Sequence, residues 1–350
     1  MKDLYAGNAT RMAKRIIEAS NSLKASGDTI LVFPHKSVDG DCVGSSCAAV
    51  MLFRKLGAKA WVCMPEKLPE NMSFMAVDDL LFMPDENFTA GSVIEGSAYK
   101  MRMSVDCSEG HRMGDCGRVF DSLDTIALDI DHHEITNLAD DYKWIEPKAS
   151  SACELVFYTA EAIANELGKP LSEVLEPRAA QCLLTGVVTD TGRFTYTNTR
   201  PETLQVAGTL MELGGNITDI CYNLFDRKKP NEFMISNTAC VKAELLYGGK
   251  MAITCVTDEM FKDFGADKDD IGDVVSRLRD IDGVELAVVL REVGDGSVRG
   301  NLRSKSFFDC TEFAANYNGG GHKRASGFTV KDMSITDLKN DIVRRTESLL

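Results

Sequence analysis

Acidic and imidazole side chains that could bind metal ions are concentrated in a few short motifs of this chain. Carboxylates with a minority of imidazoles suit Mn²⁺, Mg²⁺ or a similar divalent ion better than a thiolate-rich set would. The complete candidate set is His35, Asp39, Asp41, Asp106, Asp131, His132, His133 and Asp190. These residues are enough for two metals, and two-metal sites hydrolyse phosphate esters by stabilising both the attacking and the leaving oxygen. The sequence therefore predicts a metal-dependent phosphoesterase.

The first motif, HKSVDGD, places His35, Asp39 and Asp41 at positions i, i+4 and i+6. On a continuous helix Asp41 would point away from the other two, so we expect a loop that bends back, and Gly40 permits that bend. Gly44-Ser45 is then expected to open a helix whose free N–H groups could accept an anion. A polar Asp-Gly turn next to an incidental histidine is the alternative interpretation.

The triplet Asp131-His132-His133 is more specific than the other motifs. Two adjacent histidines at the end of a strand cannot both face the same buried core, so one could bind a metal while its neighbour points at a substrate. A solvated acidic loop is the alternative. Asp106 in SVDCSEG is uninformative alone, because strands often end in Asp. The chain has five histidines and three of them lie in these motifs, which favours a functional site.

Apolar runs before these motifs predict an α/β fold with a parallel sheet covered by helices. The expected strands are TILVF, KAWVCM, MRMSVDC and TIALDIDHH. The expected helices are residues 8–25, CAAVMLFRKLG, SACELVFYTAEAIANELG and PRAAQCLLTGVVTDTG. Ligands of open α/β sheets gather beyond the carboxyl ends of strands, where most of the acidic motifs fall. Asp190 follows a helical run instead, so its place in the cluster is inferred from composition.

The character of the chain changes near Pro230, where we place a domain boundary between residues 1–230 and 231–350. Two helices joined by Gly214-Gly215 are expected before it, in RPETLQVAGTLMELGG and ITDICYNLFDRKKP. The expected elements after it are a strand in KMAITCVT, a hairpin turned by Gly294-Asp295-Gly296, a helix, a run of three glycines, a further strand and a capped terminal helix. The second domain is therefore a smaller α/β domain.

The glycine run at Gly319–His322 is followed by Lys323 and Arg324. Glycines let a backbone approach a phosphate or a base closely, and cationic side chains would pair with the phosphate. A flexible turn is the alternative. Arg299 and Arg303 alternate along one predicted strand and share a face, with Ser304 next to the second arginine. An ordinary solvent-facing strand is the alternative for these residues.

Composition limits the partners of the protein. The formal net charge of -14 argues against a broad basic face for duplex nucleic acid, but not against a small phosphorylated substrate that meets bound metal ions. The eleven cysteines are scattered without a CxxC spacing, which indicates reduced buried thiols. No signal peptide and no apolar run long enough to cross a membrane is evident. We expect a cytoplasmic protein.

The order of the motifs HKSVDGD, SVDCSEG, DHH, TGVVTDTGRF, NLRSK and GGGHKRASG resembles the DHH/DHHA1 phosphoesterase family. Within this family it resembles the branch of oligoribonucleases (nanoRNases) and 3′-phosphoadenosine 5′-phosphate phosphatases. Val38 stands where the family usually has proline, which affects loop stiffness more than chemistry. The resemblance implies a catalytic N-terminal DHH domain and a smaller C-terminal DHHA1 domain that binds substrate, with a cleft between them.

The resemblance also implies a role for each candidate residue, with two Mn²⁺ ions per site and Mg²⁺ or Co²⁺ as substitutes. The residues implied for the first ion are His35, Asp39 and Asp106. The residues implied for the second ion are Asp41, Asp106, His132 and Asp190, so that Asp106 bridges. Asp131 would orient a histidine, and His133 would contact the scissile phosphate or protonate the leaving oxygen. The residues implied for substrate binding are Arg299, Arg303, Ser304, Gly320, Gly321 and His322.

The implied activity is hydrolysis of short oligonucleotides, including linear dinucleotides, to mononucleotides, and of 3′-phosphoadenosine 5′-phosphate to AMP, by a hydroxide that two metals activate. A homodimer is expected from family habit alone. The alternatives are a cyclic-dinucleotide phosphodiesterase, a single-strand exonuclease and a pyrophosphatase. The first usually has membrane or sensory segments, and the second would need a longer basic channel. A non-catalytic nucleotide-binding regulator is disfavoured because every metal position holds a competent residue.

Overall fold

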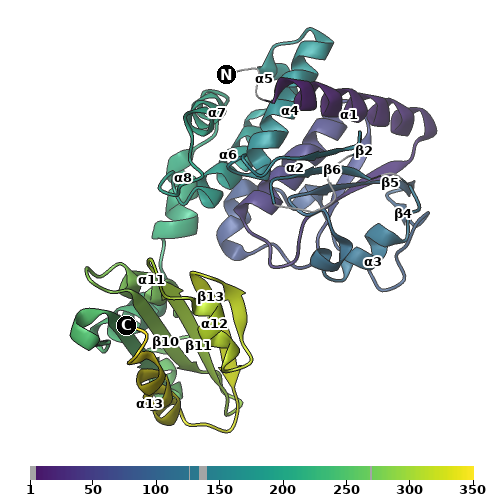
Figure 1. Cartoon of the computed structure of the whole chain (residues 1–350). Coiled ribbons are helices and arrows are strands. Elements are labelled where there is room, and N and C mark those ends of the chain that lie inside the picture. The colour runs from purple at the N-terminus through teal and green to yellow at the C-terminus, as the bar shows by residue number, and fades with distance from the viewer. Residues whose placement is uncertain (1–4, 126, 134–139, 269) are drawn as a thin grey trace. The chain divides into compact units, whose positions relative to one another are not determined.

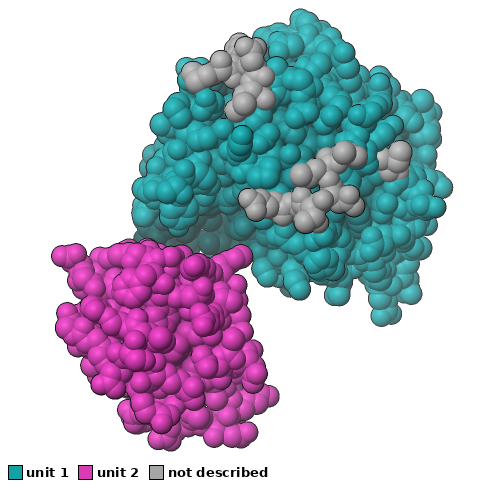
Figure 2. Space-filling view, viewed as in Figure 1, with its two compact units in different colours: residues 1–227 teal, residues 228–350 magenta. Residues whose placement is uncertain are grey.

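The computed structural model describes residues 5–125, 127–133, 140–268 and 270–350. The chain divides into two compact units, Met1–Arg227 and Lys228–Leu350 (Figure 2). Each unit has its own sheet and its own buried cores. The boundary expected at residues 230/231 lies at the start of a helix, α9 (Pro230–Val241), which belongs to the second unit.

The first unit contains a largely parallel sheet with the strand order β3-β2-β1-β5-β6-β7. Its strands are β1 (Thr29–Phe33), β2 (Lys59–Cys63), β3 (Leu81–Phe82), β5 (Ser97–Val105), β6 (Leu128–Asp131) and β7 (Lys143–Ile145), with β4 (Val93–Ile94) paired antiparallel to β5. Every residue of β1 is buried, as expected of a parallel strand that is covered on both faces. The predicted α/β fold with a parallel sheet is confirmed.

Helices cover both faces of this sheet (Figure 1). The α-helices are α1 (Ala6–Ser26), α2 (Gly40–Lys55), α3 (Cys116–Asp121), α4 (Ala152–Leu167), α5 (Leu171–Val174), α6 (Pro177–Asp190), α7 (Pro201–Glu212) and α8 (Ile217–Cys221). Ile30 and Val32 of β1 face a core shared with α1, α2, α4 and α6, whereas Leu31 and Phe33 face a second core shared with α3. Strand alternation therefore divides the apolar side chains between two layers.

Shorter helical turns complete the first unit. They are the 3₁₀ turns η1 (Glu70–Met75), η2 (Asp78–Leu80) and η3 (Gly110–Met113) and the π-helical turn η4 (Tyr222–Asp226). The helix expected over ITDICYNLFDRKKP is thus α8 followed by η4. The predicted ends of α4 are confirmed, since Ser151 caps its first turn and Gly168, with a φ of 62°, ends it.

The second unit contains a mixed sheet with the strand order β12-β13-β11-β10-β9-β8. Its strands are β8 (Glu244–Leu246), β9 (Met251–Val256), β10 (Leu286–Glu292), β11 (Val298–Ser304), β12 (Gly320–His322) and β13 (Ala325–Val330). β9 and β10 are parallel, and β10 and β11 form the predicted antiparallel hairpin. The glycine run supplies β12, which pairs antiparallel with β13, so the alternative of a flexible turn is not what the structure shows.

Helices pack on both faces of the second sheet. They are α9, α10 (Asp258–Phe264), α11 (Val274–Arg279), α12 (Cys310–Ala315) and α13 (Ile335–Thr346), together with the turn η5 (Tyr247–Gly249). Leu286 and Val288 of β10 face a core with α12 and α13, whereas Ala287 and Val289 face a core with α9, α10 and α11. The predicted terminal helix is confirmed as α13, whose first turn is capped by Ser334.

Candidate metal centre

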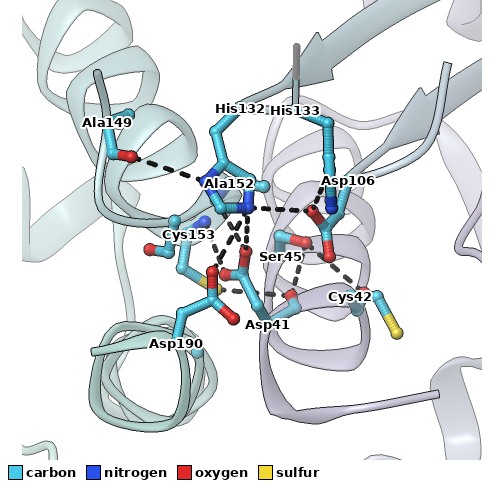
Figure 3. Close-up of polar contacts among 12 residues, drawn as sticks. Asp41, Cys42, Ser45, Asp106, His132, His133, Ala149, Ala152, Cys153 and Asp190 are labelled. Atoms are coloured by element: carbon cyan, nitrogen blue, oxygen red, sulfur yellow. Dashed lines mark hydrogen bonds and ion pairs between the residues drawn. The ribbon is translucent and has the colours of Figure 1, made fainter. Parts of the chain in front are cut away.

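Three neighbouring strands of the first unit end at the same edge and bring imidazole and carboxylate groups together. β1, β5 and β6 are adjacent in the sheet, and His35, Asp106 and His132 follow them within two residues. Asp106 has a φ of 58°, a left-handed conformation that costs free energy for a residue with a Cβ. Such strain concentrates at functional sites, and here it turns the Asp106 side chain toward the histidines (Figure 3).

Helix α2 contributes Asp39 and Asp41 from its first turn. Oδ1 of Asp39, the N-cap, accepts hydrogen bonds of 3.0 Å from the backbone N–H groups of Asp41 and Cys42. The prediction that Gly44-Ser45 opens the helix is wrong, because α2 begins at Gly40. Its first N–H groups therefore bind the Asp39 carboxylate, and the expected anion site at Gly44-Ser45 lies inside the helix.

Gly40 has a different role from the predicted one. The residue with a positive φ in this loop is Ser37, at 61°, so the bend occurs there. A Cβ at Gly40 would lie 2.5 Å from Oγ1 of Thr189 on α6, and a Cβ at Gly186 would lie 2.5 Å from Oδ1 of Asp41. These glycines allow α2 and α6 to approach closely, which brings the end of α6 to the candidate site.

Asp190, the last residue of α6, reaches the cluster from this helix. Its Oδ2 lies 3.2 Å from Nε2 of His132. Its backbone oxygen accepts a hydrogen bond of 3.1 Å from the Asn198 side chain. The structure therefore places this carboxylate in the cluster, where composition alone had suggested that it lies.

Asp106 lies between two groups of candidate ligands. Its Oδ2 is 3.3 Å from Nε2 of His35, and its Oδ1 is 3.4 Å from Nε2 of His132. The His35 ring is also 3.7 Å from Oδ2 of Asp39, whereas the His132 ring is 3.7 Å from Oδ2 of Asp41. The Asp106 carboxylate is therefore shared by two neighbouring groups of candidate ligands.

The rings of His35 and His132 are oriented in the same way. Nδ1 of His35 lies 2.8 Å from the carbonyl oxygen of Lys36, and Nδ1 of His132 lies 3.4 Å from that of Ala149. In both rings Nε2 is therefore directed at the carboxylates. Histidines that bind metals typically hold their second nitrogen against a carbonyl or a carboxylate in this manner.

His133 has a different partner. Its Nδ1 is 2.8 Å from Oδ1 of Asp131, and its backbone N–H donates to the same oxygen at 3.0 Å. The hydroxyl of Ser108 donates to Oδ2 of Asp131 at 2.9 Å. The buried Asp131 carboxylate thus fixes the His133 ring, and the ring nitrogen that remains, Nε2, can exchange a proton with a bound molecule.

The candidate ligands are crowded, and this crowding shifts the pKa values of their carboxylates and imidazoles. Burial and the neighbouring carboxylates raise the pKa of Asp41 to about 7 and the pKa of Asp190 to about 8. Burial would raise the pKa of Asp106, but hydrogen bonds to His132 and His35 lower it to about 2. Burial would lower the pKa of His132, but Asp106 and the other carboxylates raise it to about 10. A divalent cation would relieve the repulsion between these acids.

The residues present fit a divalent metal. Three groups in the described part of the chain have ligand atoms close enough to hold an ion: His35 with Asp39 and Cys42, Asp106 with His132 and His133, and Asp41 with His132 and Asp190. Asp106 Oδ1 is buried, and its neighbours Nε2 of His132 and Nδ1 of His133 each lie 3.4 Å away, longer than a well-formed hydrogen bond. A bound metal would satisfy this buried oxygen more fully than these long contacts do. Carboxylates and imidazoles make up most of this donor set, and both bind divalent metal ions.

The substrate-binding candidates are in the second unit, and not all of them lie together. A hollow of about 670 Å³ is lined by Arg299, Asn301, Arg303, Asn318, Gly319, Gly320, His322, Ala325, Ser326, Gly327, Phe328 and Thr329. Arg299, Arg303, Gly320 and His322 are thus brought together as predicted. Ser304 is not, because its buried hydroxyl donates to the carbonyl of Phe308. Gly321 does not line the hollow either.

Sequence reasoning missed the residues that support the candidate ligands. Ser108 stands in the motif SVDCSEG without an expected role, and Ser151 is expected only as the start of a helix. Glu154, Asn198 and Arg200 were not singled out at all. Spacing does not mark these residues, because their partners are far away along the chain. The available signal for Glu154 was a carboxylate between Cys153 and Leu155, in the apolar first half of the predicted helix.

Comparison with known proteins identifies the class. The model described as the DHH family, N-terminal domain matches residues 29–187, and the DHHA1 domain matches residues 248–350. The chain therefore belongs to the DHH family and carries a DHHA1 domain after the DHH domain. This family is metal-dependent, in agreement with the acidic and histidine clusters described above.

The chain is also similar in sequence to individual curated proteins. The chain is 27% identical over 314 residues to the bifunctional oligoribonuclease and PAP phosphatase NrnA of Thermus thermophilus, covering 89% of this chain and 87% of the relative. It is 26% identical over 314 residues to the protein of the same name from Bacillus subtilis, covering 89% and 92%. The cyclic-di-AMP phosphodiesterase PdeA of Listeria monocytogenes is 23% identical, but this chain covers 51% of its length.

Solved structures support the fold. An exopolyphosphatase-related protein from Bacteroides fragilis has a TM-score of 0.78 at 22% identity, covering 96% of this chain and 97% of that one. The exonuclease RecJ bound to manganese has a TM-score of 0.55 at 15% identity, covering 97% and 94%. At these identities the likeness concerns the fold alone. Among the described residues, no helix has the length and apolar character needed to span a bilayer.

Proposed function

We propose that this protein is a metal-dependent phosphoesterase that hydrolyses short oligonucleotides, such as linear dinucleotides, to mononucleotides, and 3′-phosphoadenosine 5′-phosphate to AMP. The observation that carries the proposal is the position of Asp106, which contacts His35 on one side and His132 on the other. The names of the curated relatives supply the substrate class. We also propose that the enzyme acts in the cytoplasm and forms a homodimer.

Two Mn²⁺ ions are the proposed cofactors, with Mg²⁺ or Co²⁺ as substitutes. The proposed ligands are His35, Asp39 and Asp106 for one ion and Asp41, Asp106, His132 and Asp190 for the other. Such ions supply a nucleophilic water at neutral pH and stabilise the charges of the attacking and leaving oxygens. The short distances from Asp106 to both rings support its assignment as the bridging ligand.

The protein side chains are proposed to act around that chemistry. Asp131 holds His133 through Nδ1, which supports a role for Nε2 as a proton donor to the leaving oxygen or as a contact to the scissile phosphate. Asp131 is buried, and its hydrogen bonds with His133 lower its pKa although burial alone would raise it.

The second unit is proposed to bind the nucleotide end that is not cleaved. Arg299 and Arg303 project from the same face of β11, and their guanidinium groups can pair with phosphate oxygens. The flat glycine-rich wall beside them lets a sugar or base approach the backbone. A substrate of a few nucleotides requires few cations, which suits the net charge of -14.

The test is hydrolysis in the presence of Mn²⁺ of a 5′-phosphorylated RNA dinucleotide and, in parallel, of 3′-phosphoadenosine 5′-phosphate. We expect both to be hydrolysed and Asp106→Ala to lower kcat/KM by at least about 10³-fold, because loss of the shared ligand removes both ions. Asp124→Ala, at an exposed aspartate of the same unit, is the control and should leave the rates unchanged.

Substrates of other types decide between this proposal and its alternatives. A cyclic dinucleotide and inorganic pyrophosphate are assayed beside the two substrates above. Preference for the cyclic dinucleotide would contradict the proposed substrate class while leaving the metal site intact. If well-folded protein loaded with Mn²⁺ hydrolysed neither the dinucleotide nor the bisphosphate, the proposal would be overturned.

A further inference from the structure

We propose that the buried ion pair of Glu154 and Arg200 positions the metal centre by holding the turn before α4 in place. This inference rests on the proposed function, since it concerns the affinity of the same site for its metal ions. Neither residue touches the candidate ligands directly. Both act through the backbone of residues 149–153, and we therefore describe them as positioning residues.

The turn at residues 149–153 touches two candidate ligands (Figure 3). The backbone N–H groups of Ala152 and Cys153 donate to the two carboxylate oxygens of Asp41, at 2.7 and 2.9 Å. The carbonyl oxygen of Ala149 lies 3.4 Å from Nδ1 of His132. A shift of this turn would therefore displace a carboxylate and an imidazole of the same proposed metal ion together.

Glu154 binds this turn from inside the protein. Its side chain has no exposed surface, and Oε2 accepts hydrogen bonds from the backbone N–H of Ser150 at 3.0 Å and from its hydroxyl at 2.5 Å. The same oxygen accepts one from the hydroxyl of Thr203 at 3.1 Å. Oε1 accepts one from Nη2 of Arg200 at 2.9 Å. Glu154 thus links the turn to the first residues of α7.

Asn198 extends the network to a third candidate ligand. Its side-chain amide donates to the carbonyl oxygen of Ser150 at 3.0 Å and to that of Asp190 at 3.1 Å. Asn198 precedes Arg200 by two residues, so the segment that supplies the guanidinium also supplies this amide. The proposed ligands Asp41, His132 and Asp190 are all tied to the turn that Glu154 holds.

The choice of charged residues fits a positioning role. A buried carboxylate with a single guanidinium partner is weak evidence for stability, since apolar residues of similar volume often serve equally well. The ion pair instead fixes the orientation of the carboxylate, because the planar Arg200 and the hydroxyl of Thr203 hold both oxygens of Glu154 in place. Residues that support ligands in this way typically change metal affinity by about 10- to 100-fold when they are replaced.

The experiment measures Mn²⁺ binding directly, by the electron paramagnetic resonance signal of free Mn²⁺ during titration of the chelator-treated full chain. We expect Arg200→Met to raise the dissociation constant by about 10- to 100-fold. Thr203→Val removes one donor to Glu154 without leaving an unpaired charge, and we expect a smaller rise of about fivefold. Turnover at saturating Mn²⁺ should largely recover in both variants.

Arg178→Met is the control, because Arg178 forms an ion pair with Asp79 in the same unit, away from the candidate ligands. It should leave Mn²⁺ binding unchanged. Circular dichroism at the titration temperature establishes that each variant is folded. If Arg200→Met does not fold, Thr203→Val decides. Unchanged Mn²⁺ affinity in a folded Thr203→Val protein, with any loss confined to thermal stability, would overturn the inference.

The same titration separates this inference from the proposed function. If the wild-type protein binds Mn²⁺ and hydrolyses dinucleotide while the variants bind equally well, the inference falls and the function stands. If the variants bind Mn²⁺ more weakly but the wild type hydrolyses neither substrate, the inference stands and the function falls. A wild-type protein that binds no Mn²⁺ would overturn both.

Discussion

Adjacent residues His132 and His133 are distinguished by the partner of a single ring nitrogen. In His132, Nδ1 faces a backbone carbonyl and Nε2 faces three carboxylates. In His133, Nδ1 is bonded to the carboxylate of Asp131. The carbonyl of Ala149 directs Nε2 of His132 at the carboxylates, whereas Asp131 holds the His133 ring by Nδ1. This difference supports the proposed roles of His132 in metal binding and of His133 in proton transfer.

Replacement of His133 tests this division of roles. We expect His133→Asn to lower kcat for the dinucleotide by about 10²- to 10⁴-fold, the usual contribution of a positioned general acid, while Mn²⁺ binding changes little. His132→Asn should instead weaken Mn²⁺ binding. The checks are steady-state kinetics at saturating metal and a Mn²⁺ titration of each variant.

His111→Asn serves as the matched control, because the His111 side chain is 74% exposed and lies outside the cluster. It should have wild-type kinetics. If His133→Asn lost Mn²⁺ as His132→Asn does, the assignment of His133 to proton transfer would be wrong.

At the scale of elements, the close crossing of α2 and α6 decides whether the site forms. Gly44 on α2 would place a Cβ 2.3 Å from the carbonyl oxygen of Cys182 on α6, and Gly186 on α6 would place one 2.8 Å from Cα of Asp41 on α2. Side chains at these positions would push the helices apart. Asp190 stands at the end of α6, so this separation sets its distance from Asp41 and His132.

We expect Gly186→Ala to destabilise the first unit by about 1–3 kcal/mol through overpacking and to weaken Mn²⁺ binding more than tenfold, because the added methyl group also meets Oδ1 of Asp41. Gly208→Ala on α7 is the control, since a Cβ there has no neighbour within 4 Å among the described residues. It should be neutral or stabilise by up to about 1 kcal/mol. Equal behaviour of the two variants in thermal unfolding and Mn²⁺ titration would contradict this account.

The difference between predicted and observed elements has physical causes. His35, Asp106 and His132 could be predicted because each follows an apolar strand, and parallel strands end at one edge of a sheet. Asp190 could not be placed by spacing, because its position depends on how two helices cross. Ser304 lies outside the hollow that Arg303 lines, because neighbouring residues of a strand face opposite sides of the sheet. The support from Glu154 depends on contacts between distant segments that no local pattern encodes.

At the scale of the whole molecule, the chain separates a candidate metal centre in one unit from a cation-lined hollow in the other. The metal candidates lie between residues 35 and 190, and the hollow is formed by residues 299–329. We therefore expect the second unit to affect mainly substrate binding. The strongly acidic composition agrees with a substrate that carries few phosphates.

Replacement of Arg303 tests this separation. Arg303→Ala should raise KM for the dinucleotide about tenfold or more while kcat and Mn²⁺ binding stay near wild-type values, because a contact to a phosphate away from the reacting atoms contributes uniform binding. Lys331→Ala, beyond the end of β13, is the control and should not alter KM. An unchanged KM in Arg303→Ala would show that the assigned role is wrong.

The central claim is that divalent ions held around Asp106 perform the hydrolysis. The most direct measurement follows dinucleotide hydrolysis in chelator-treated protein as Mn²⁺ is returned, together with the number of ions bound per chain. We predict no turnover before Mn²⁺ is added, recovery as about two ions bind, and loss of both binding and turnover in Asp106→Ala. Full turnover in the presence of EDTA, or unaltered Mn²⁺ binding in Asp106→Ala, would contradict the claim.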